Sequence, residues 1–314
     1  MSEINTHRSV LMKEVLQALN IQASGVYFDG TFGRGGHAGE ILKRLGPSGK
    51  LLAMDKDPEA IRSANEKFAN DKRFTIVQGS FAMMADVIKR VGLTGQVNGV
   101  LLDLGVSSPQ LDNADRGFSF MKQGPLDMRM DTTQGLSATE WLAQAEEDEI
   151  STVIRDYGEE KFHYRIAKAI VEQRQSSVLM TTLDLANLIE KVIPKKGREK
   201  GKHPATRTFQ AIRIFINREL EDLQTGLQSA VEALALHGRM AVISFHSLED
   251  RIVKRFLRKK VQGKQLPPDL PVQYEDTGAE LKLISKAIRP SKEEVEENIR
   301  SRSATLRIAE KIIE

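Results

Sequence analysis

Short apolar segments alternate with amphipathic segments in the first part of the chain. The apolar segments have the length of β-strands and lie at residues 26–29, 50–55, 74–78 and 97–104. Between them, apolar residues recur at helical spacing, at 37–45, from Pro58 onward and at 82–91, and a similar pattern at 9–20 precedes the first strand. The segment Gly99-Val-Leu-Leu-Asp-Leu104 is apolar almost throughout, as expected of a strand buried on both faces of a parallel sheet. The pattern predicts an α/β fold with a doubly wound, mostly parallel sheet.

This alternation stops after Leu104 and resumes only near residue 210. Within the interruption, helical patterns are predicted at 137–149, 150–156, 159–175 and 182–193. The α/β pattern then continues with a helix at 210–236, a strand at 239–244 and a helix at 248–260. Two further strand-like segments, 280–286 and 303–309, are joined by a polar link with a short helix at 292–298, and they could close the sheet as an antiparallel pair. We therefore predict a core formed by residues 1–110 and 213–314, and an all-helical inserted domain at 111–212 that binds the substrate.

The first predicted strand runs directly into a glycine-rich turn, Asp29-Gly-Thr-Phe-Gly-Arg-Gly-Gly-His37. A strand, a tight turn and a helix N-terminus in this order are typical of nucleotide-binding sites. Glycine tolerates positive φ and has no Cβ, so backbone N–H groups at such a turn can approach a ligand closely. The turn is predicted to bind a nucleotide, and a surface loop without a ligand is the alternative.

Three acidic residues stand at the carboxyl ends of three predicted strands: Asp29, Asp55 and Asp103. These strand ends converge on the ligand crevice of an open parallel sheet. A carboxylate after the second strand can accept hydrogen bonds from both hydroxyls of a ribose, which makes Asp55 the candidate for that contact. A single aspartate in such a place is often only a helix N-cap, but three at these intervals favour one shared site.

Two cofactors fit the turn. Gly33-x-Gly35-x-x-Ala38 matches a relaxed dinucleotide fingerprint with an acid about twenty residues later, so an NAD-dependent oxidoreductase stays open. The early acid Asp29 favours S-adenosylmethionine, because its carboxylate can bind the amino group of that cofactor. The N–H groups from Gly35 to His37 can bind the cofactor's carboxylate at the helix start. Phe81, just after the third strand, is placed to lie against the adenine.

Composition excludes several classes of chemistry. The 314 residues are 40% hydrophobic and 28% charged, and no apolar run approaches the roughly 18 residues that span a membrane. The start of the chain does not resemble a signal peptide, so a cytoplasmic protein without membrane contact is expected. Cysteine is absent, which excludes disulfides, cysteine-bound metal and a thiol nucleophile. Methyl transfer to a ring carbon of a pyrimidine base normally needs such a nucleophile, whereas transfer to nitrogen or ribose oxygen does not.

Positive charge is concentrated in two segments. Residues 191–213 contain eight Lys or Arg and one acid, and residues 251–264 contain seven and none. Because the net charge is only +3, these segments rather than the whole chain would bind RNA phosphates. A solvated helix face is the plainer explanation of each, and a non-catalytic RNA-binding module is a third interpretation of the chain. The candidate substrate contacts are His203, Arg207, Arg213, Ser244 and Arg251.

Six blocks of sequence resemble the signature of the RsmH (MraW) family. They begin at Asp29 (DGTFGRGGH), Leu101 (LLDLGVSSPQLD), Arg116 (RGFSF), Gly124 (GPLDMRMD), His203 (HPATRTFQA) and Ile243 (ISFHSLEDR). The resemblance implies a class I methyltransferase with a helical insertion, which methylates N4 of a cytidine in the decoding centre of bacterial 16S ribosomal RNA. It also implies that S-adenosylmethionine is bound by Gly35, Gly36, His37, Asp55, Phe81, Asp103 and Gln110. The expected partner is 16S ribosomal RNA or the small ribosomal subunit, and a homodimer is left open.

Direct methyl transfer to an amine requires the nitrogen, the methyl carbon and the sulfur to be nearly collinear. An acceptor for an amine proton would assist, and Asp103 is the first candidate, followed by His246 at the end of the fifth strand. The target base must leave its stack to reach the methyl group. Phe118, Phe120 and Trp141 are candidates to contact it, although core packing is the commoner fate of such residues.

Overall fold

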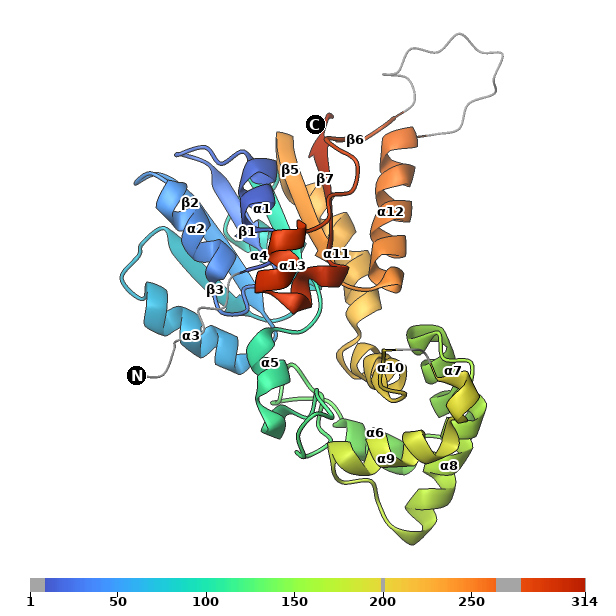
Figure 1. Cartoon of the computed structure of the whole chain (residues 1–314). Helices are drawn as coiled ribbons and strands as arrows, with labels where there is room; N and C mark the ends of the chain where they lie inside the picture. Colours follow the sequence, from blue (N-terminus) through green and yellow to red (C-terminus); the bar gives the residue numbers. More distant parts are fainter. Residues whose placement is uncertain (1–8, 199–200, 264–277, 314) are drawn as a thin grey trace, which may run out of the picture. The chain divides into compact units, whose positions relative to one another are not determined.

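The computed structural model describes residues 9–198, 201–263 and 278–313 (Figure 1). Residues 199, 200 and 264 of the two basic segments lie outside the described residues. The chain forms two compact units. We call residues up to Gly105 and from Leu220 onward the core unit, and Val106–Glu219 the helical unit.

The core unit is built on a sheet with the strand order β3-β2-β1-β4-β5-β7-β6. Its strands are β1 (Val26–Asp29), β2 (Lys50–Asp55), β3 (Phe74–Gln78), β4 (Val97–Asp103), β5 (Leu234–Ser244), β6 (Leu281–Leu283) and β7 (Thr305–Lys311). Strands β1 to β5 are parallel to one another, whereas β7 runs antiparallel to both β5 and β6. The predicted doubly wound sheet with an antiparallel C-terminal pair is confirmed.

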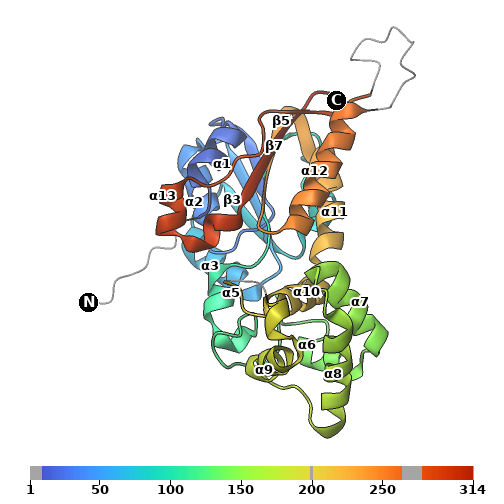
Figure 2. The same cartoon turned by 45° about the vertical axis from the view of Figure 1, so that its right-hand side comes forward.

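Helices cover both faces of this sheet (Figures 1 and 2). On one face, α1 (Met12–Leu19), α2 (Gly36–Arg44) and α3 (Pro58–Phe68) contribute Val15, Ile41 and Ala60 to a buried apolar layer. On the other face, α4 (Met84–Arg90), α11 (Glu219–Ala233) and α12 (Ser247–Gln262) contribute to a second layer. The short α13 (Lys292–Glu297) lies in the link between β6 and β7. Burial of both sheet faces explains why the strands are nearly continuous apolar runs.

The helical unit has a core of its own. It contains α5 (Ser108–Asp112), α6 (Ala138–Gln144), α7 (Glu147–Gly158), α8 (His163–Ser176), α9 (Thr182–Val192) and α10 (Thr206–Asn217). Trp141, Ile154, Ile166, Leu185 and Ile212 meet in its interior. Apart from an isolated β-bridge between Pro125 and Thr181, its described regular structure is helical.

Several predicted element boundaries were wrong. The division expected between residues 149 and 150 lies at 145–146, between α6 and α7, and the strand expected at 280–286 is only Leu281–Leu283. The single helix expected at 210–236 is two helices, because Arg218 takes a left-handed conformation with φ 52° between α10 and α11. Just before it, the side chain of Asn217 donates to the carbonyl of Met128, which fixes the end of α10 against a distant loop. Strand β5 begins at Leu234 rather than at 239, and its pairing with β4 is irregular near Val97.

Within the part of the chain that the structure describes, none of the helices is both long enough and apolar enough to cross a lipid bilayer.

Candidate cofactor and active site

The glycine-rich turn connects β1 to α2 in the core unit. Gly33 and Gly35 have φ values of 56° and 75°, which an L-residue with a Cβ rarely adopts. A Cβ on Gly35 would lie 2.5 Å from the Phe32 ring, and one on Gly36 would lie 2.0 Å from the hydroxyl of Ser9. The packing of the turn itself therefore requires glycine at positions 35 and 36, whether or not a ligand is bound.

Asp55 fixes the geometry of this turn. One of its carboxylate oxygens accepts the N–H of Gly33 at 2.7 Å, and the other accepts the N–H of Asp57 at 2.9 Å. Burial raises the pKa of Asp55 from 3.8 to about 6, and the two backbone hydrogen bonds oppose that rise. Each oxygen keeps a further lone pair, so the oriented carboxylate can still accept hydrogen bonds from a ligand.

Asp29 and Asp103 end the neighbouring strands β1 and β4, and Thr31 lies between them. Thr31 donates its N–H to Asp29 at 3.1 Å, and its hydroxyl oxygen accepts the N–H of Asp103 at 2.6 Å. Burial raises the pKa of Asp29 to about 7 and that of Asp103 to about 8, and the charge of Asp29 contributes to the second shift. Thr31 was not predicted as a site residue, because the sequence does not show which hydroxyl faces a strand end.

His37 lies beside this group of carboxyls. Its Nε2 is 3.7 Å from Oδ2 of Asp103, beyond hydrogen-bond distance, and only 5% of the residue is exposed. Burial lowers the pKa of His37 to about 4, so the imidazole is neutral at physiological pH. Oδ1 of Asp103 is buried and has no hydrogen-bond partner among the described residues. The site thus gathers Asp29, Asp55 and Asp103 beside a neutral imidazole, an arrangement that favours a cationic ligand.

Phe81 follows β3 at the same edge of the sheet. Its ring packs against α11, where a Cβ added to Gly226 would lie 2.4 Å from the ring. The preceding Ser80 donates its hydroxyl to Asp222 of α11 at 2.6 Å, and the same carboxylate pairs with Lys56 at 2.6 Å. The loop that carries Phe81 is therefore anchored on α11, and the expected contact of Phe81 with adenine stays a prediction.

The end of β5 carries the next group of predicted residues. Ser244 is buried and donates its hydroxyl to the carbonyl of Thr305 at 3.3 Å. His246 is the N-cap of α12 and lies 3.2 Å from a carboxylate oxygen of Glu249. The other oxygen of Glu249 accepts the N–H of Phe245 at 2.8 Å. The contacts of His246 are those of a helix cap, and its catalytic role stays a prediction.

Glu249 was missed by the sequence prediction. It is 2% exposed, and its charge contributes to the raised pKa of Asp103. An acid three residues after an N-cap is the signature of a capping box, and this pattern could have indicated it. Arg251, two residues further along α12, is exposed.

Four predicted residues belong to the helical unit. Gln110 is buried, and its side-chain oxygen accepts the N–H of Ser107 as part of the N-terminal cap of α5. Arg207 donates to the carbonyl of Glu159 at 2.6 Å. Arg213 binds both carboxylate oxygens of Glu219, at 2.8 and 2.9 Å. His203 stacks on Phe120 with ring centroids 4.6 Å apart. The predicted cofactor contact of Gln110 and RNA contacts of the other three remain predictions.

The aromatic candidates divide by burial. Phe118 and Trp141 are 6% and 4% exposed and belong to the core of the helical unit, whereas Phe120 is only partly buried. The indole N–H of Trp141 donates to Glu149 at 2.8 Å. Phe118 and Trp141 thus have the core packing that is the commoner fate of such residues.

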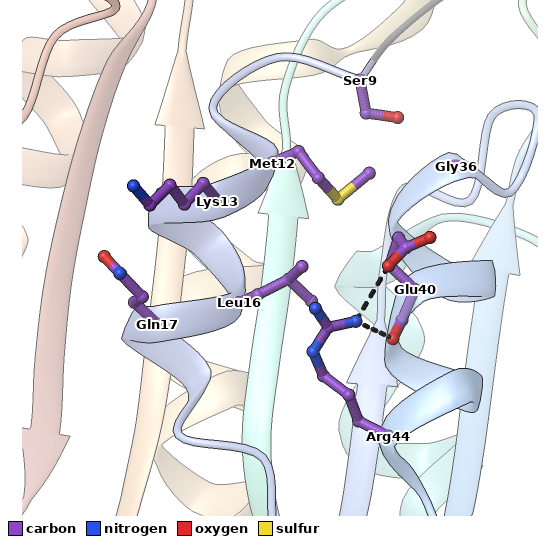
Figure 3. A pocket seen from close by; sticks show the side chains of 8 residues that line it. All are labelled: Ser9, Met12, Lys13, Leu16, Gln17, Gly36, Glu40 and Arg44. Atoms are coloured by element: carbon purple, nitrogen blue, oxygen red, sulfur yellow. Dashed lines mark hydrogen bonds and ion pairs between the residues drawn. The ribbon is translucent and has the colours of Figure 1, made fainter.

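A pocket of about 700 Å³ lies between α1 and α2 (Figure 3). Its lining is mixed, with Lys13, Leu16 and Gln17 on α1, and with Glu40 and Arg44, which are hydrogen-bonded to each other, on α2. The pocket reaches Gly36 but is not lined by any of the three strand-end acids. The carboxyl cluster therefore defines the candidate active site, and this pocket does not.

Two features define a class I methyltransferase fold. The first is the strand order, in which a reversed β7 lies next to β5. The second is a glycine-rich turn after β1, with acids at three strand ends. The family model described as "MraW methylase family" matches residues 4–312. The chain belongs to the MraW methylase family.

Two relatives show the extent of the similarity. The chain is 55% identical over 308 residues to "Ribosomal RNA small subunit methyltransferase H" of Alteromonas mediterranea, with 98% of this chain and 97% of the relative covered. It is 56% identical over 311 residues to the protein of that name from Nitrosococcus oceani, with 99% and 98% covered. A solved rRNA methylase from Streptococcus thermophilus is 8% identical, with a TM-score of 0.41 and 96% and 93% covered. A likeness at that level carries no further argument.

Proposed function

We propose that this chain transfers a methyl group from S-adenosylmethionine to the exocyclic N4 amine of a cytidine in the decoding centre of 16S ribosomal RNA. The proposal is supported by the family, by relatives that bear the name of a small-subunit ribosomal RNA methyltransferase, and by the cluster of Asp29, Asp55 and Asp103. The cluster is the observation that carries it, because it offers one site to a ligand that is a cation and also has vicinal hydroxyls. The N4 position and the decoding centre rest on the sequence blocks that resemble the RsmH family.

S-adenosylmethionine is the cofactor, and when bound it supplies an electrophilic methyl group on a positively charged sulfonium. The residues present fit it. Ionising several buried carboxyls close together is costly without a cation, and the raised pKa values of Asp29 and Asp103 express that cost. In this arrangement Asp29 would bind the amino group, and Asp55 would accept hydrogen bonds from the ribose hydroxyls. The N–H groups of Gly36 and His37, at the start of the nine-residue helix α2, would bind the carboxylate.

Asp103 is the proposed proton acceptor. The amine gains a bond to carbon in the reaction and must lose a proton to become the neutral methylated amine. The positive charge of the cofactor would favour the ionised form of Asp103. A carboxylate whose pKa burial raises to about 8 would then take up a proton more readily than an ordinary aspartate. Oδ1 of Asp103 is available for this, because no described residue hydrogen-bonds to it.

The RNA would be bound through exposed cations. On α12, Arg251, Lys254, Arg255 and Arg258 are exposed, and in the helical unit Lys195 and Lys196 are exposed as well. Cations that neutralise phosphates release counterions, so the affinity should fall steeply as salt is raised. The absence of cysteine supports transfer to nitrogen over transfer to C5 of the ring.

Two measurements test the proposal. In calorimetric titrations, S-adenosylmethionine should bind and NAD should not, and the reverse result would indicate an oxidoreductase. Small ribosomal subunits from a strain that lacks the gene should then accept a labelled methyl group from S-adenosylmethionine into their RNA. An Asp55→Ala variant serves as the control and should incorporate far less label when the cofactor is not saturating. RNA binding without label transfer by the unaltered chain would leave only the non-catalytic RNA-binding interpretation.

A further inference from the structure

Three rings in the helical unit form a stack that leads from its core to its surface. Phe209, on α10, is 4% exposed, and Phe120 meets it edge-on with centroids 4.9 Å apart and an interplanar angle of 75°. His203 lies on Phe120 almost face to face, at 4.6 Å and 29°. Phe120 is partly buried and His203 is exposed, so the imidazole is the outermost ring of the stack.

Two hydrogen bonds, one to its ring and one to its backbone carbonyl, fix the orientation of His203. Its Nδ1 accepts the N–H of Ala205 at 3.2 Å, and its carbonyl accepts the N–H of Thr206 at 3.0 Å, at the first turn of α10. The Nδ1 bond requires that this nitrogen carry no proton. A ring held by stacking and by a hydrogen bond loses little freedom when a ligand covers it, which favours binding.

Cations lie on the segments that meet near the start of α10, where His203 stands. Arg207 lies in the first turn of α10 and donates to the carbonyl of Glu159, which joins the start of α10 to the turn before α8. Gly197 packs against the ring of Phe162, where a Cβ would lie 2.3 Å away, so the segment with Lys195 and Lys196 meets the same turn. The cations of this surface are Lys161, Arg165, Lys195, Lys196, Arg198, Lys202 and Arg207. Its described acids include Glu159, Glu160 and Glu190. Glu160 is buried and accepts the N–H of Phe162, and Glu190 pairs with Arg198 at 2.8 Å.

An exposed flat ring next to a cationic surface matches the chemistry of single-stranded RNA. A base offers a π-face that stacks on imidazole or phenyl rings, and the phosphates on either side of it need cations. A duplex would not offer such a face, because its bases are stacked on one another. A protein partner with acidic groups would use the cations but not the ring.

We infer that His203, supported by Phe120, is a stacking platform for an unpaired base of the substrate RNA. This inference rests on the proposed function, because it takes RNA as the substrate. Removing a base–aromatic stack typically weakens single-strand binding about tenfold or more. His203→Ala should therefore weaken binding to that extent, whereas His203→Phe should bind like the unaltered chain, since it keeps a flat ring.

The test compares two fluorescein-labelled probes by anisotropy with the full chain: a twelve-nucleotide oligoadenylate and an abasic strand with the same backbone. The unaltered chain and His203→Phe should prefer the strand with bases, and His203→Ala and Phe120→Leu should lose most of that preference. His237→Asn is the matched control, because His237 is an exposed histidine with no ring partner among the described residues. It should behave like the unaltered chain.

Two results would overturn the inference: equal affinity of His203→Ala and the unaltered chain for oligoadenylate, or loss of the base preference in His203→Phe. If His203→Ala does not fold, as judged by circular dichroism, the base preferences of His203→Phe and Phe120→Leu decide the question: the first should keep the preference and the second should lose most of it. Failure of the proposed function is a separate outcome. It would appear as a base preference that depends on His203 in a chain that transfers no methyl group.

Discussion

Replacing Asp103 by Asn should stabilise the cofactor-free protein at neutral pH, and the gain should disappear in acid. Burial raises the pKa of Asp103 from 3.8 to about 8. A raised carboxyl pKa contributes stability below the unfolded value, and that stability is lost as the pH rises through the folded value. At pH 7, about three pH units above the unfolded pKa, the folded protein has lost about 4 kcal/mol of stability, at 1.36 kcal/mol per unit. Because the side chain is 24% exposed, solvent screening reduces this to about 2 kcal/mol.

Asn has nearly the same shape as Asp and does not ionise, so Asp103→Asn removes this cost. The melting temperature should rise by roughly 4–8 °C at pH 7, and the difference should shrink toward zero near pH 4. Calorimetry or circular dichroism at a series of pH values from 4 to 8.5 measures it. Asp71→Asn is the matched control, because Arg73 holds the pKa of Asp71 below its ordinary value and its effect should be constant above pH 5. Parallel melting curves for Asp103→Asn and the unaltered chain across this range would refute the reasoning.

The same carboxyl should respond to the cofactor. A bound cation favours the ionised form of Asp103, so binding of S-adenosylmethionine at pH 7 should release a proton. Calorimetric titration in phosphate and in Tris separates this release from the binding enthalpy, because the two buffers differ in ionisation enthalpy. Asp103→Asn should release less, and an identical release would assign the proton to another group.

The remaining predictions concern both units. Asp55→Ala should weaken cofactor binding about a hundredfold and leave RNA affinity nearly unchanged, because Asp55 holds the N–H of Gly33 and with it the turn. Calorimetry measures the cofactor affinity and anisotropy the RNA affinity, and equal losses of both would contradict the prediction. Asn217→Ala should destabilise the helical unit by about 2 kcal/mol, because its amide binds backbone groups of the loop at 128–130. The fluorescence of the single tryptophan in urea reports this, and an unchanged midpoint would count against it. Arg213→Lys should lower the same midpoint, because lysine cannot reproduce the two-pronged bond of Arg213 to its carboxylate; a midpoint equal to that of the unaltered chain would show that the fork is dispensable.

Much of the core unit could be predicted from sequence because its elements are marked locally. The first three strands have the predicted bounds, since each apolar run is closed by a polar residue at its carboxyl end. The strand-end acids could be grouped because parallel strands bring these ends to one edge of the sheet. The break at Arg218 could not be predicted, because neither Gly nor Pro marks it. Its cause is the contact of Asn217 with a loop far away in the sequence.

The site was predictable in its strand-end acids and less so in what holds them. That Asp55 accepts the N–H of Gly33 depends on the path of the turn, which the glycine pattern alone does not specify. Thr31 reaches the site through a hydrogen bond to the backbone of Asp103, and nothing in its spacing indicates that bond. The residues that support a ligand-binding group are set by three-dimensional packing and thus escape a linear pattern.

The central claim is tested most directly by identifying the methylated nucleoside. Small ribosomal subunits from a strain lacking the gene are incubated with the protein and isotopically labelled S-adenosylmethionine, and their RNA is digested to nucleosides for mass spectrometry. The label should appear in N4-methylcytidine, and Asp103→Asn should lower the yield per unit time. Label in 5-methylcytidine or in a ribose-methylated nucleoside, or no label in the RNA, would contradict the account.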